Sequence, residues 1–419
     1  KTMFKTIGLK NFRTHKDSTI ELSDLTLLIG SNNSGKSNFF AGLHYFSRLL
    51  SLFNPDRNNI NYELRGNNYF SQKHSLSKDD EPIEFSCSWE LNETIIKYEL
   101  SIFPDLENNS NILCKEKLVI GGSTTEEFKH GYLKKSNQLL LRKQIRDSSS
   151  NFSGLIFDFF QDLASFYYYN FQPSFLKGEG VPLIFSEGRK IPLRKKDYIK
   201  DYRETKRYPN VPSELGKEGT SLQEILMYIK EYEEETYNRF FGYLKRFVKN
   251  FNGLIIKDNE IKWQFDMGGS NFPFYEPEKI SDGLVKAAAV ALLCSLKRPP
   301  ALILLEEVEN GINQKKLSEF LSWLTHASDK STKTQFVLSS HSPSVIREFS
   351  DKLDTVYNIH LRERDFVSRI TNLNEAIKPL VNMGTIQEES TITKNGKEVI
   401  QIRPYHLIEL FFNGVLGEL

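Results

Sequence analysis

The chain has 419 residues, enough for two lobes with ample core, and its net charge of +1 excludes a strongly basic field over the whole protein. No apolar run approaches the roughly 20 residues of a membrane span, and the segment from Lys1 to His15 is too polar for a secretion signal. Cys87, Cys114 and Cys294 are scattered without metal spacing, which suits a reducing cytoplasm. Together these observations lead us to expect a soluble, cytoplasmic protein with no membrane partner.

The first third of the chain is predicted to consist mainly of strands. Alternating or continuous apolar patterns indicate strands at 4–12, 18–22, 25–29, 81–90, 95–103 and 117–120. Helical spacing of apolar residues then indicates helices at 157–163 and 222–251, without the sustained heptads of a coiled-coil arm. From Gly253 onward, strands return and then alternate with helices.

These elements predict an α/β fold with a mixed, partly parallel central sheet, an antiparallel β subdomain and a helical insertion. We expect an N-terminal lobe over 1–150, the helical insertion over 151–252 and a C-terminal lobe over 253–419.

The most specific motif is Gly30-Ser31-Asn32-Asn33-Ser34-Gly35-Lys36-Ser37, which has the G-x-x-x-x-G-K-[ST] spacing of a phosphate loop. An apolar strand precedes it and a helical pattern follows it, as the motif requires. In such a loop the backbone N–H groups and the helix N-terminus bind phosphate oxygens. Lys36 would neutralise the β- and γ-phosphates, and Ser37 would bind Mg²⁺. We assign nucleotide binding to Asn32, Asn33, Ser34, Gly35, Lys36, Ser37 and Asn38.

Two acids complete the predicted site. The apolar run 301–305 indicates a buried parallel strand, and Glu306 and Glu307 follow at its carboxyl end, where open α/β sheets bind ligands. Glu306 would hold Mg²⁺, and Glu307 would accept a proton from the attacking water. Adjacent carboxylates repel each other, which favours a cation beside them. After the next strand, 335–338, His341 is placed to sense a γ-phosphate.

A further anion-binding end is predicted before a buried helix. Ser281 and Asp282 suit the N-cap of a helix that is apolar almost all round, and its first N–H groups would face an anion.

In this order, these pieces resemble the ABC-type ATPase superfamily, and most closely its SMC, RecF and overcoming-lysogenization-defect (OLD) branch. The resemblance covers about residues 3–50 and 279–345. It assigns roles in a set of motifs: Arg13 of Lys10-Asn11-Phe12-Arg13 near the nucleotide, Ser281-Asp282-Gly283 as signature motif, Glu306-Glu307 as Walker B with the catalytic glutamate, Glu309-Asn310-Gly311 as D-loop, and His341 as switch histidine. Gln72 matches the glutamine lid, a metal ligand, only weakly. Glu306 stands where aspartate is usual, and Asn313 where many relatives have histidine.

The resemblance implies a slow ATPase that uses ATP and Mg²⁺. Two subunits would pair head to tail, with each ATP held between Lys36 of one and Ser281 of the other, so we expect a homodimer or a higher homo-oligomer. The residues after His341 contain no Asp-x-Asp of a TOPRIM nuclease, so a separate effector protein, a nuclease, is expected. This pattern is similar to the ATPase subunits of prokaryotic antiphage defence systems of the PtuA or AriA type.

The alternative is a RecF- or SMC-like ATPase of DNA repair or chromosome maintenance that binds DNA directly. The segment from Arg189 to Arg207 holds nine Lys or Arg against three Asp or Glu, with interleaved tyrosines. It is either a nucleic-acid or partner arm or a solvated insertion. The apolar segment 407–414 either docks on a neighbouring protein or packs in the core.

Overall fold

The computed structural model describes residues 3–52, 72–78, 80–104, 112–121, 123–130, 153–178, 183–186, 189–192, 211–258, 260–270, 272–329, 334–362, 364–394 and 396–412. Contacts divide the chain into two compact units. Unit 1 consists of Lys1–Phe166, Ala301–Leu304 and Lys333–Leu419, and unit 2 of Tyr167–Pro300 and Leu305–Thr332. The three consecutive parts expected from the sequence remain a prediction; by contacts, both ends of the chain belong to unit 1.

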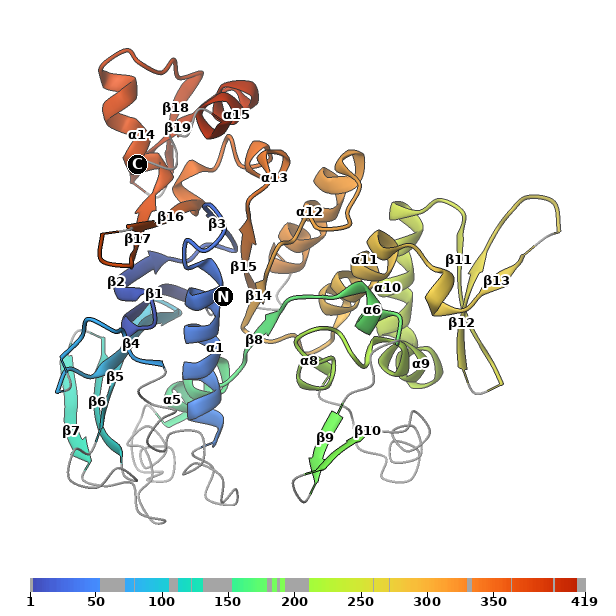
Figure 1. Cartoon of the computed structure of the whole chain (residues 1–419), viewed down its shortest axis with the longest axis horizontal. Coiled ribbons are helices and arrows are strands. Elements are labelled where there is room, and N and C mark those ends of the chain that lie inside the picture. The colour runs from blue at the N-terminus through green and yellow to red at the C-terminus, as the bar shows by residue number, and fades with distance from the viewer. Residues whose placement is uncertain are drawn as a thin grey trace. The chain divides into compact units, whose positions relative to one another are not determined.

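Unit 1 contains a six-stranded antiparallel sheet in the order β2-β1-β4-β5-β6-β7 (Figure 1). Its strands are β1 (Met3–Phe12), β2 (His15–Glu21), β4 (Ile83–Leu91), β5 (Thr94–Pro104), β6 (Ile112–Ile120) and β7 (Ser123–His130). Helix α1 (Lys36–Leu52) packs on it through Phe46, whose ring stacks on Phe85 at 4.5 Å between centroids. This sheet is the predicted antiparallel subdomain.

The second six-stranded sheet is mixed and has the order β17-β16-β3-β15-β14-β8. Its strands are β3 (Leu25–Ile29), β8 (Phe166–Tyr169), β14 (Leu302–Leu305), β15 (Gln335–Ser340), β16 (Val356–Arg362) and β17 (Val367–Asn372). β3 pairs in parallel with both β15 and β16, whereas β17 is antiparallel to β16. The continuous apolar runs of β3, β14 and β15 are buried, as expected of parallel strands covered on both faces.

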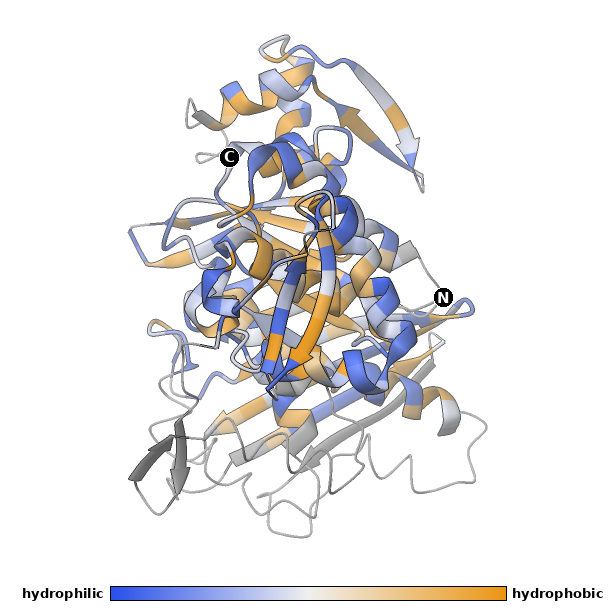
Figure 2. Ribbon diagram, turned by 90° about the vertical axis from the view of Figure 1, so that its right-hand side faces the viewer, coloured by the Kyte–Doolittle hydropathy of each residue, from blue (hydrophilic) through white to orange (hydrophobic). Residues whose placement is uncertain are grey.

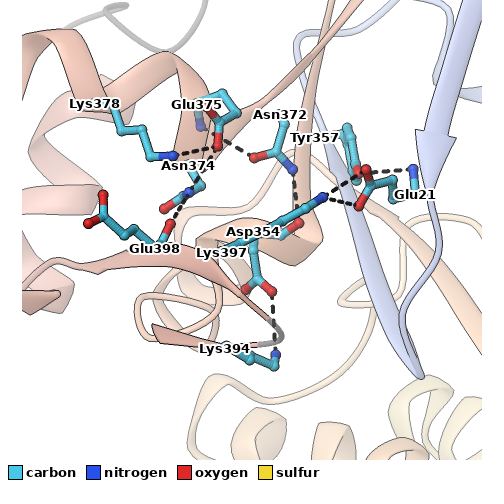
Figure 3. A network of polar contacts seen from close by, with 10 residues as sticks. All are labelled: Glu21, Asp354, Tyr357, Asn372, Asn374, Glu375, Lys378, Lys394, Lys397 and Glu398. Carbon is cyan, nitrogen blue, oxygen red and sulfur yellow. Dashed lines mark hydrogen bonds and ion pairs between the residues drawn. The ribbon is translucent and has the colours of Figure 1, made fainter. Parts of the chain in front are cut away.

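The remaining elements of unit 1 are α5 (Ser153–Leu163), α13 (Pro343–Arg347), η2 (Leu353–Thr355), α14 (Leu373–Asn382), β18 (Ser390–Lys394), β19 (Lys397–Gln401) and α15 (Pro404–Phe412). Polar contacts tie the β18–β19 hairpin to the rest of the unit (Figure 3). Lys397 Nζ lies 2.8 and 2.6 Å from the two carboxylate oxygens of Glu21, and buried Asn374 bonds the backbone of β19 at Glu398 O and Ile400 N. The buried amide stabilises the hairpin more than the exposed ion pair does.

Unit 2 is mainly helical. It contains α6 (Pro173–Leu176), β9 (Leu183–Ser186), β10 (Arg189–Pro192), α8 (Val211–Glu214), α9 (Leu222–Tyr232), α10 (Glu234–Phe247), β11 (Phe251–Lys257), β12 (Glu260–Phe265), β13 (Phe274–Tyr275), η1 (Pro277–Lys279), α11 (Asp282–Ser295) and α12 (Gln314–Asp329). Figure 2 shows helices that carry both hydrophobic and hydrophilic residues along their length, as helices with one buried face do. In α11, by contrast, every residue from Leu284 to Ser295 is buried, as predicted.

The prediction of one helix over 222–251 is wrong. The chain leaves the helical conformation at Glu233 (φ −126°, ψ 60°), which separates α9 from α10, and Phe251 already begins β11. Both helices bury an apolar face, so the apolar spacing continues across the break and does not reveal it. In the part of the chain that the structure describes, no helix is long and apolar enough to cross a membrane.

Candidate nucleotide-binding site

The phosphate loop lies in unit 1 between β3 and α1, as the sequence predicts. Gly30 and Gly35 have φ values of +146° and +112°, which side-chain-bearing residues rarely adopt. A Cβ added to Gly30 would lie 2.1 Å from the carbonyl oxygen of Ile359, and one added to Gly35 would lie 2.1 Å from Ser368 Oγ. Only glycine therefore fits at either position without displacing a neighbour.

Lys36 is held across the loop by the loop's own oxygens. Its ammonium donates to the carbonyl oxygens of Gly30 and Ser31, both at 2.8 Å, and lies 3.4 Å from Ser34 Oγ. The side chain is 8% exposed. Phosphate oxygens would make stronger, charge-assisted bonds to this cation than neutral carbonyls do. The N-terminus of the 17-residue α1, which begins at Lys36, adds the positive end of a helix dipole.

His15 supports the loop from β2 and was not found from the sequence. Its fully buried ring lies with Nε2 2.9 Å from the carbonyl oxygen of Gly35 and Nδ1 2.9 Å from Ser18 Oγ. A carbonyl oxygen can only accept, so Nε2–H donates to it and Nδ1 accepts from the Ser18 hydroxyl. Burial lowers the pKa of His15 to about 4, which keeps the ring neutral at pH 7.

Ser368 supports the same loop from β17, more than 300 residues later in the chain. Its hydroxyl donates to the carbonyl oxygen of Ser34 at 2.7 Å and lies 2.8 Å from Thr14 Oγ1, while its backbone N–H donates to Thr14 O. No local pattern marks this serine, because its role depends on the hairpin of β16 and β17 that brings it to the loop.

Arg13, Gln72 and Asn38 form one hydrogen-bonded group at the first turn of α1. Arg13 donates through Nη1 to Asn38 Oδ1 at 3.2 Å and through Nε to Gln72 Oε1 at 3.0 Å. Its backbone N–H also donates to Gln72 O. The structure therefore brings Arg13 and Gln72 next to the helix that follows the phosphate loop.

His341 follows β15 at the same sheet edge as the phosphate loop. In the parallel pair of β15 and β3, Ser340 lies opposite Ile29, so His341 and Gly30 are the next residues at the carboxyl ends of their strands. Ligands bind at this edge in open α/β sheets. The His341 side chain is exposed, as are Asn32, Asn33 and Ser37 in the loop, whereas Ser34 is buried.

The acidic pair belongs to unit 2, immediately after β14. Glu306 is 8% exposed, and its Oε2 accepts from the Tyr168 hydroxyl and from Asn170 Nδ2 at 3.1 Å, which fixes the carboxylate. Glu307 has a left-handed backbone (φ +46°), and its carboxylate accepts from Asn310 Nδ2. A non-glycine residue in this conformation is uncommon and is found where the surroundings hold it.

Lys286 is the surrounding residue that holds Glu307. From α11, its 4% exposed side chain donates to the Glu307 carbonyl oxygen at 2.6 Å. Burial lowers the pKa of Lys286 to about 8, and the carboxylates of Glu309 and Glu307 act against that decrease. The start of α11 also contacts the segment that follows β14, because a Cβ on Gly283 would lie 2.2 Å from Gly311 O. Packing alone therefore requires glycine at position 283, independently of any role of Gly283 in nucleotide binding.

Ser281 occupies the N-cap position of α11 with φ −63° and ψ 146°, but its side chain makes no capping hydrogen bond. The structure confirms an N-cap at this point of the sequence, without a hydrogen bond from the Ser281 side chain. Asp282, the first helical residue, pairs instead with Lys177 Nζ at 2.7 Å. Of the basic segment Arg189–Arg207, the structure describes only the backbone of β10, so Arg194, Lys195 and Lys196 lie outside the described residues.

The phosphate loop contains two required glycines and an inward lysine, and it joins a strand to a helix at the carboxyl edge of a mixed sheet. These features define a P-loop ATPase. The chain belongs to the family described as "AAA domain, putative AbiEii toxin, Type IV TA system", whose model matches residues 25–347. This match confirms the predicted α/β P-loop fold and a nucleotide-binding protein.

Comparison with solved structures finds head domains of SMC proteins. One, bound to the C-winged helix domain of ScpA, has 14% identity and a TM-score of 0.46, covering 89% of this chain and 99% of that chain. The Thermotoga maritima SMC head has 16% identity and a TM-score of 0.40, covering 88% and 98%. The Pyrococcus furiosus SMC head, which has an extended coiled coil and is bound to the C-terminal domain of ScpA, has 15% identity and a TM-score of 0.44. The match covers 92% of this chain and 100% of that chain. No curated protein matches the chain.

Proposed function

We propose that this protein is a slow ATPase that works as a switch. The observation that carries the proposal is the position of Lys36, whose ammonium is held inside the loop at the N-terminus of α1. The loop residues Asn32 to Asn38 would hold the phosphates, with Arg13 near the nucleotide. Glu307 would take the proton of the attacking water, and His341 would contact the γ-phosphate.

Taken singly, Ser37 and Glu306 each offer the kind of oxygen ligand that Mg²⁺ takes, which supports its binding together with a nucleotide. Ser37 offers an exposed hydroxyl, and Glu306 offers a carboxylate fixed by Tyr168 and Asn170. Mg²⁺ usually takes one or two protein ligands and completes its shell with phosphates and water. Within the described ranges, no group of three His, Cys, Asp or Glu side chains is placed to hold a metal ion. Gln72 would have to exchange its bond to Arg13 before it reached a metal.

We further propose that two copies pair head to tail, with Ser281, Asp282 and Gly283 of one copy against the ATP bound by Lys36 of the other. The Ser281 hydroxyl is not used as a helix cap, which supports a role toward a ligand. Such a dimer would control a separate effector, a nuclease, in a prokaryotic antiphage defence complex. The family description, which names a toxin of a type IV TA system, supports this setting.

The second candidate is an ATPase of DNA repair or chromosome maintenance that binds DNA directly, which the basic composition of Arg189–Arg207 favours. Salt-dependent DNA affinity that falls when Arg194, Lys195 and Lys196 are neutralised would support it. Absence of DNA binding, together with copurification of a neighbouring gene's product, would support the defence complex.

Two variants test the ATPase switch. Lys36→Ala should abolish ATP binding, whereas Glu307→Gln should bind ATP, stall hydrolysis and accumulate the closed dimer. Lys97→Ala and Glu99→Gln, exposed positions on β5, are the matched controls. Binding, phosphate release and dimer formation would be measured for all four. Tight ATP binding by Lys36→Ala would refute the site, and a parental rate for Glu307→Gln would show that Glu307 is not the base.

A further inference from the structure

An open surface cavity of about 370 Å³ lies in unit 2, and none of its lining residues belongs to the phosphate loop. One stripe of α10 lines it with Asn238, Arg239, Gly242, Tyr243 and Arg246, and the last turn of α12 adds His326. The volume is in the range of roughly 300–1,000 Å³ that small-molecule sites occupy. The two helices pack together in this unit (Figure 1).

The positive groups of this cavity are held in place. Arg239 donates through Nε and Nη2 to the carbonyl oxygen of Ser295, at 2.9 and 2.7 Å, at the end of α11. A third N–H group bonds Glu235, so three of the five donors of the guanidinium are used in these contacts. Arg246 lies over the ring of Tyr243, with 5.3 Å from its guanidinium carbon to the centroid. Stacking on an aromatic face restricts a guanidinium without neutralising its charge.

The charge of the cavity is positive. Within the described ranges, Arg246 and His326 make no ion pair with an acid, and Glu235 is the acid on this face of α10. Glu235 is already shared between Arg239 and Lys297, whose Nζ lies 3.3 Å from it. Basic side chains in a last helical turn are favoured by the helix dipole, which alone would account for Arg246 and His326. Arg239 lies mid-helix and is positioned instead by its bonds to Ser295 O and Glu235.

Gly242 supplies an independent observation. It lies in the interior of α10, where glycine is the poorest helix former after proline. Its backbone does not need glycine, because its φ is not positive, and a Cβ at this position would meet no atom within 4 Å. The missing side chain therefore serves neither the fold of the helix nor its packing. Its effect is to keep the floor of the basic cavity open.

We propose that this cavity is a binding site for a phosphate-bearing ligand, either a mononucleotide or the backbone phosphate of a nucleic-acid strand. Guanidinium groups match the oxygens of phosphate with paired N–H donors, and the two arginines supply them from positions two turns apart on α10. A phosphate group is common to a free nucleotide and to a nucleic-acid strand, so the same two arginines would serve either ligand. The proposal does not depend on the proposed ATPase function.

The test uses the full chain in a Lys36→Ala background, which removes the lysine of the phosphate loop. Binding of labelled AMP and of a short labelled oligothymidylate would be measured by fluorescence anisotropy. Gly242→Leu, which fills the cavity with a good helix former, and Arg246→Glu should each weaken binding about tenfold or more. The matched controls, Gly154→Leu on α5 and Lys249→Glu just after α10, should stay within about twofold of the background protein.

Binding of AMP alone, of the oligonucleotide alone or of both, with this loss in the two cavity variants, supports the proposal and identifies the phosphate source. Equal binding by the cavity variants and the control variants overturns it. Displacement of either probe by oligoglutamate as effectively as by inorganic phosphate also overturns it, because the cavity would then be a site for acidic peptides. Circular dichroism of each variant verifies that the chain keeps the helix content of the background protein.

Discussion

Acidification is predicted to destabilise the phosphate loop through His15. The ring is fully buried, donates to the Gly35 carbonyl oxygen and accepts from the Ser18 hydroxyl, so the fold accommodates only its neutral form. Protonation would bury a cation with which no acid forms an ion pair among the residues that the structure describes. Burial accordingly lowers the pKa of His15 from 6.5 to about 4.

The magnitude follows from proton linkage. Between pH 6.5 and about 4 the unfolded chain binds a proton at His15 that the folded chain excludes, so stability rises with pH across this window. The contribution of neutral His15 is complete above pH 6.5 and is lost as the pH falls toward the folded pKa. At about 1.4 kcal/mol per pKa unit, the loss by pH 4 is about 3 kcal/mol.

Denaturant unfolding followed by circular dichroism at a series of pH values tests this effect. His15→Gln keeps an N–H donor for Gly35 but cannot be protonated, so its unfolding free energy should depend less on pH than that of the parent by about 3 kcal/mol between pH 7 and pH 4. His406→Gln on α15 is the matched control and should keep the parental slope. Equal slopes in the parent and His15→Gln would refute the reasoning, because the folded protein would then accept the proton at His15.

Two further predictions concern the supports of the loop and of the acidic pair. Gly35→Ala should lower the unfolding free energy by about 2–4 kcal/mol, because a positive φ costs about 1–2 kcal/mol and the new methyl group collides with Ser368 Oγ. Ser368→Gly in the same chain should restore about 1 kcal/mol of this in a double-mutant cycle, and strictly additive effects would contradict the collision. Lys286→Met should lower kcat about 10–100-fold with little change in ATP affinity, because Lys286 holds the Glu307 backbone. Lys286→Arg should restore part of the rate, and an unchanged kcat in steady-state phosphate release would exclude this positioning role.

Much of the fold could be predicted because its signals are local. The strand at 25–29 has the bounds of β3, and the buried character of α11 follows from its continuous apolar composition. The helix over 222–251 was wrong because apolar spacing reports which face is buried, and α9 and α10 both bury one. Ser281 does occupy the N-cap position of α11, although a suitable residue at an N-cap does not have to use its hydroxyl.

The residues that support the site could not be predicted, because they act on backbone oxygens far away in the sequence. His15 and Ser368 bond the carbonyl oxygens of Gly35 and Ser34, and Lys286 bonds that of Glu307. A carbonyl oxygen is present at every residue, so it leaves no pattern that would identify its partner. Only the packed structure shows which donors reach these atoms.

The sequence by itself determined the phosphate loop, because two glycines, a lysine and a serine at the right spacing between a strand and a helix specify its backbone locally. Tertiary structure decided how that loop is held. The parallel pairing of β3 with β15 and β16 brings the end of the chain to its beginning, which places His341 at the sheet edge beside Gly30 and lets Ser368 reach the loop. Such contacts depend on strand order and register, which arise from the burial of whole sheets and not from any short stretch of sequence.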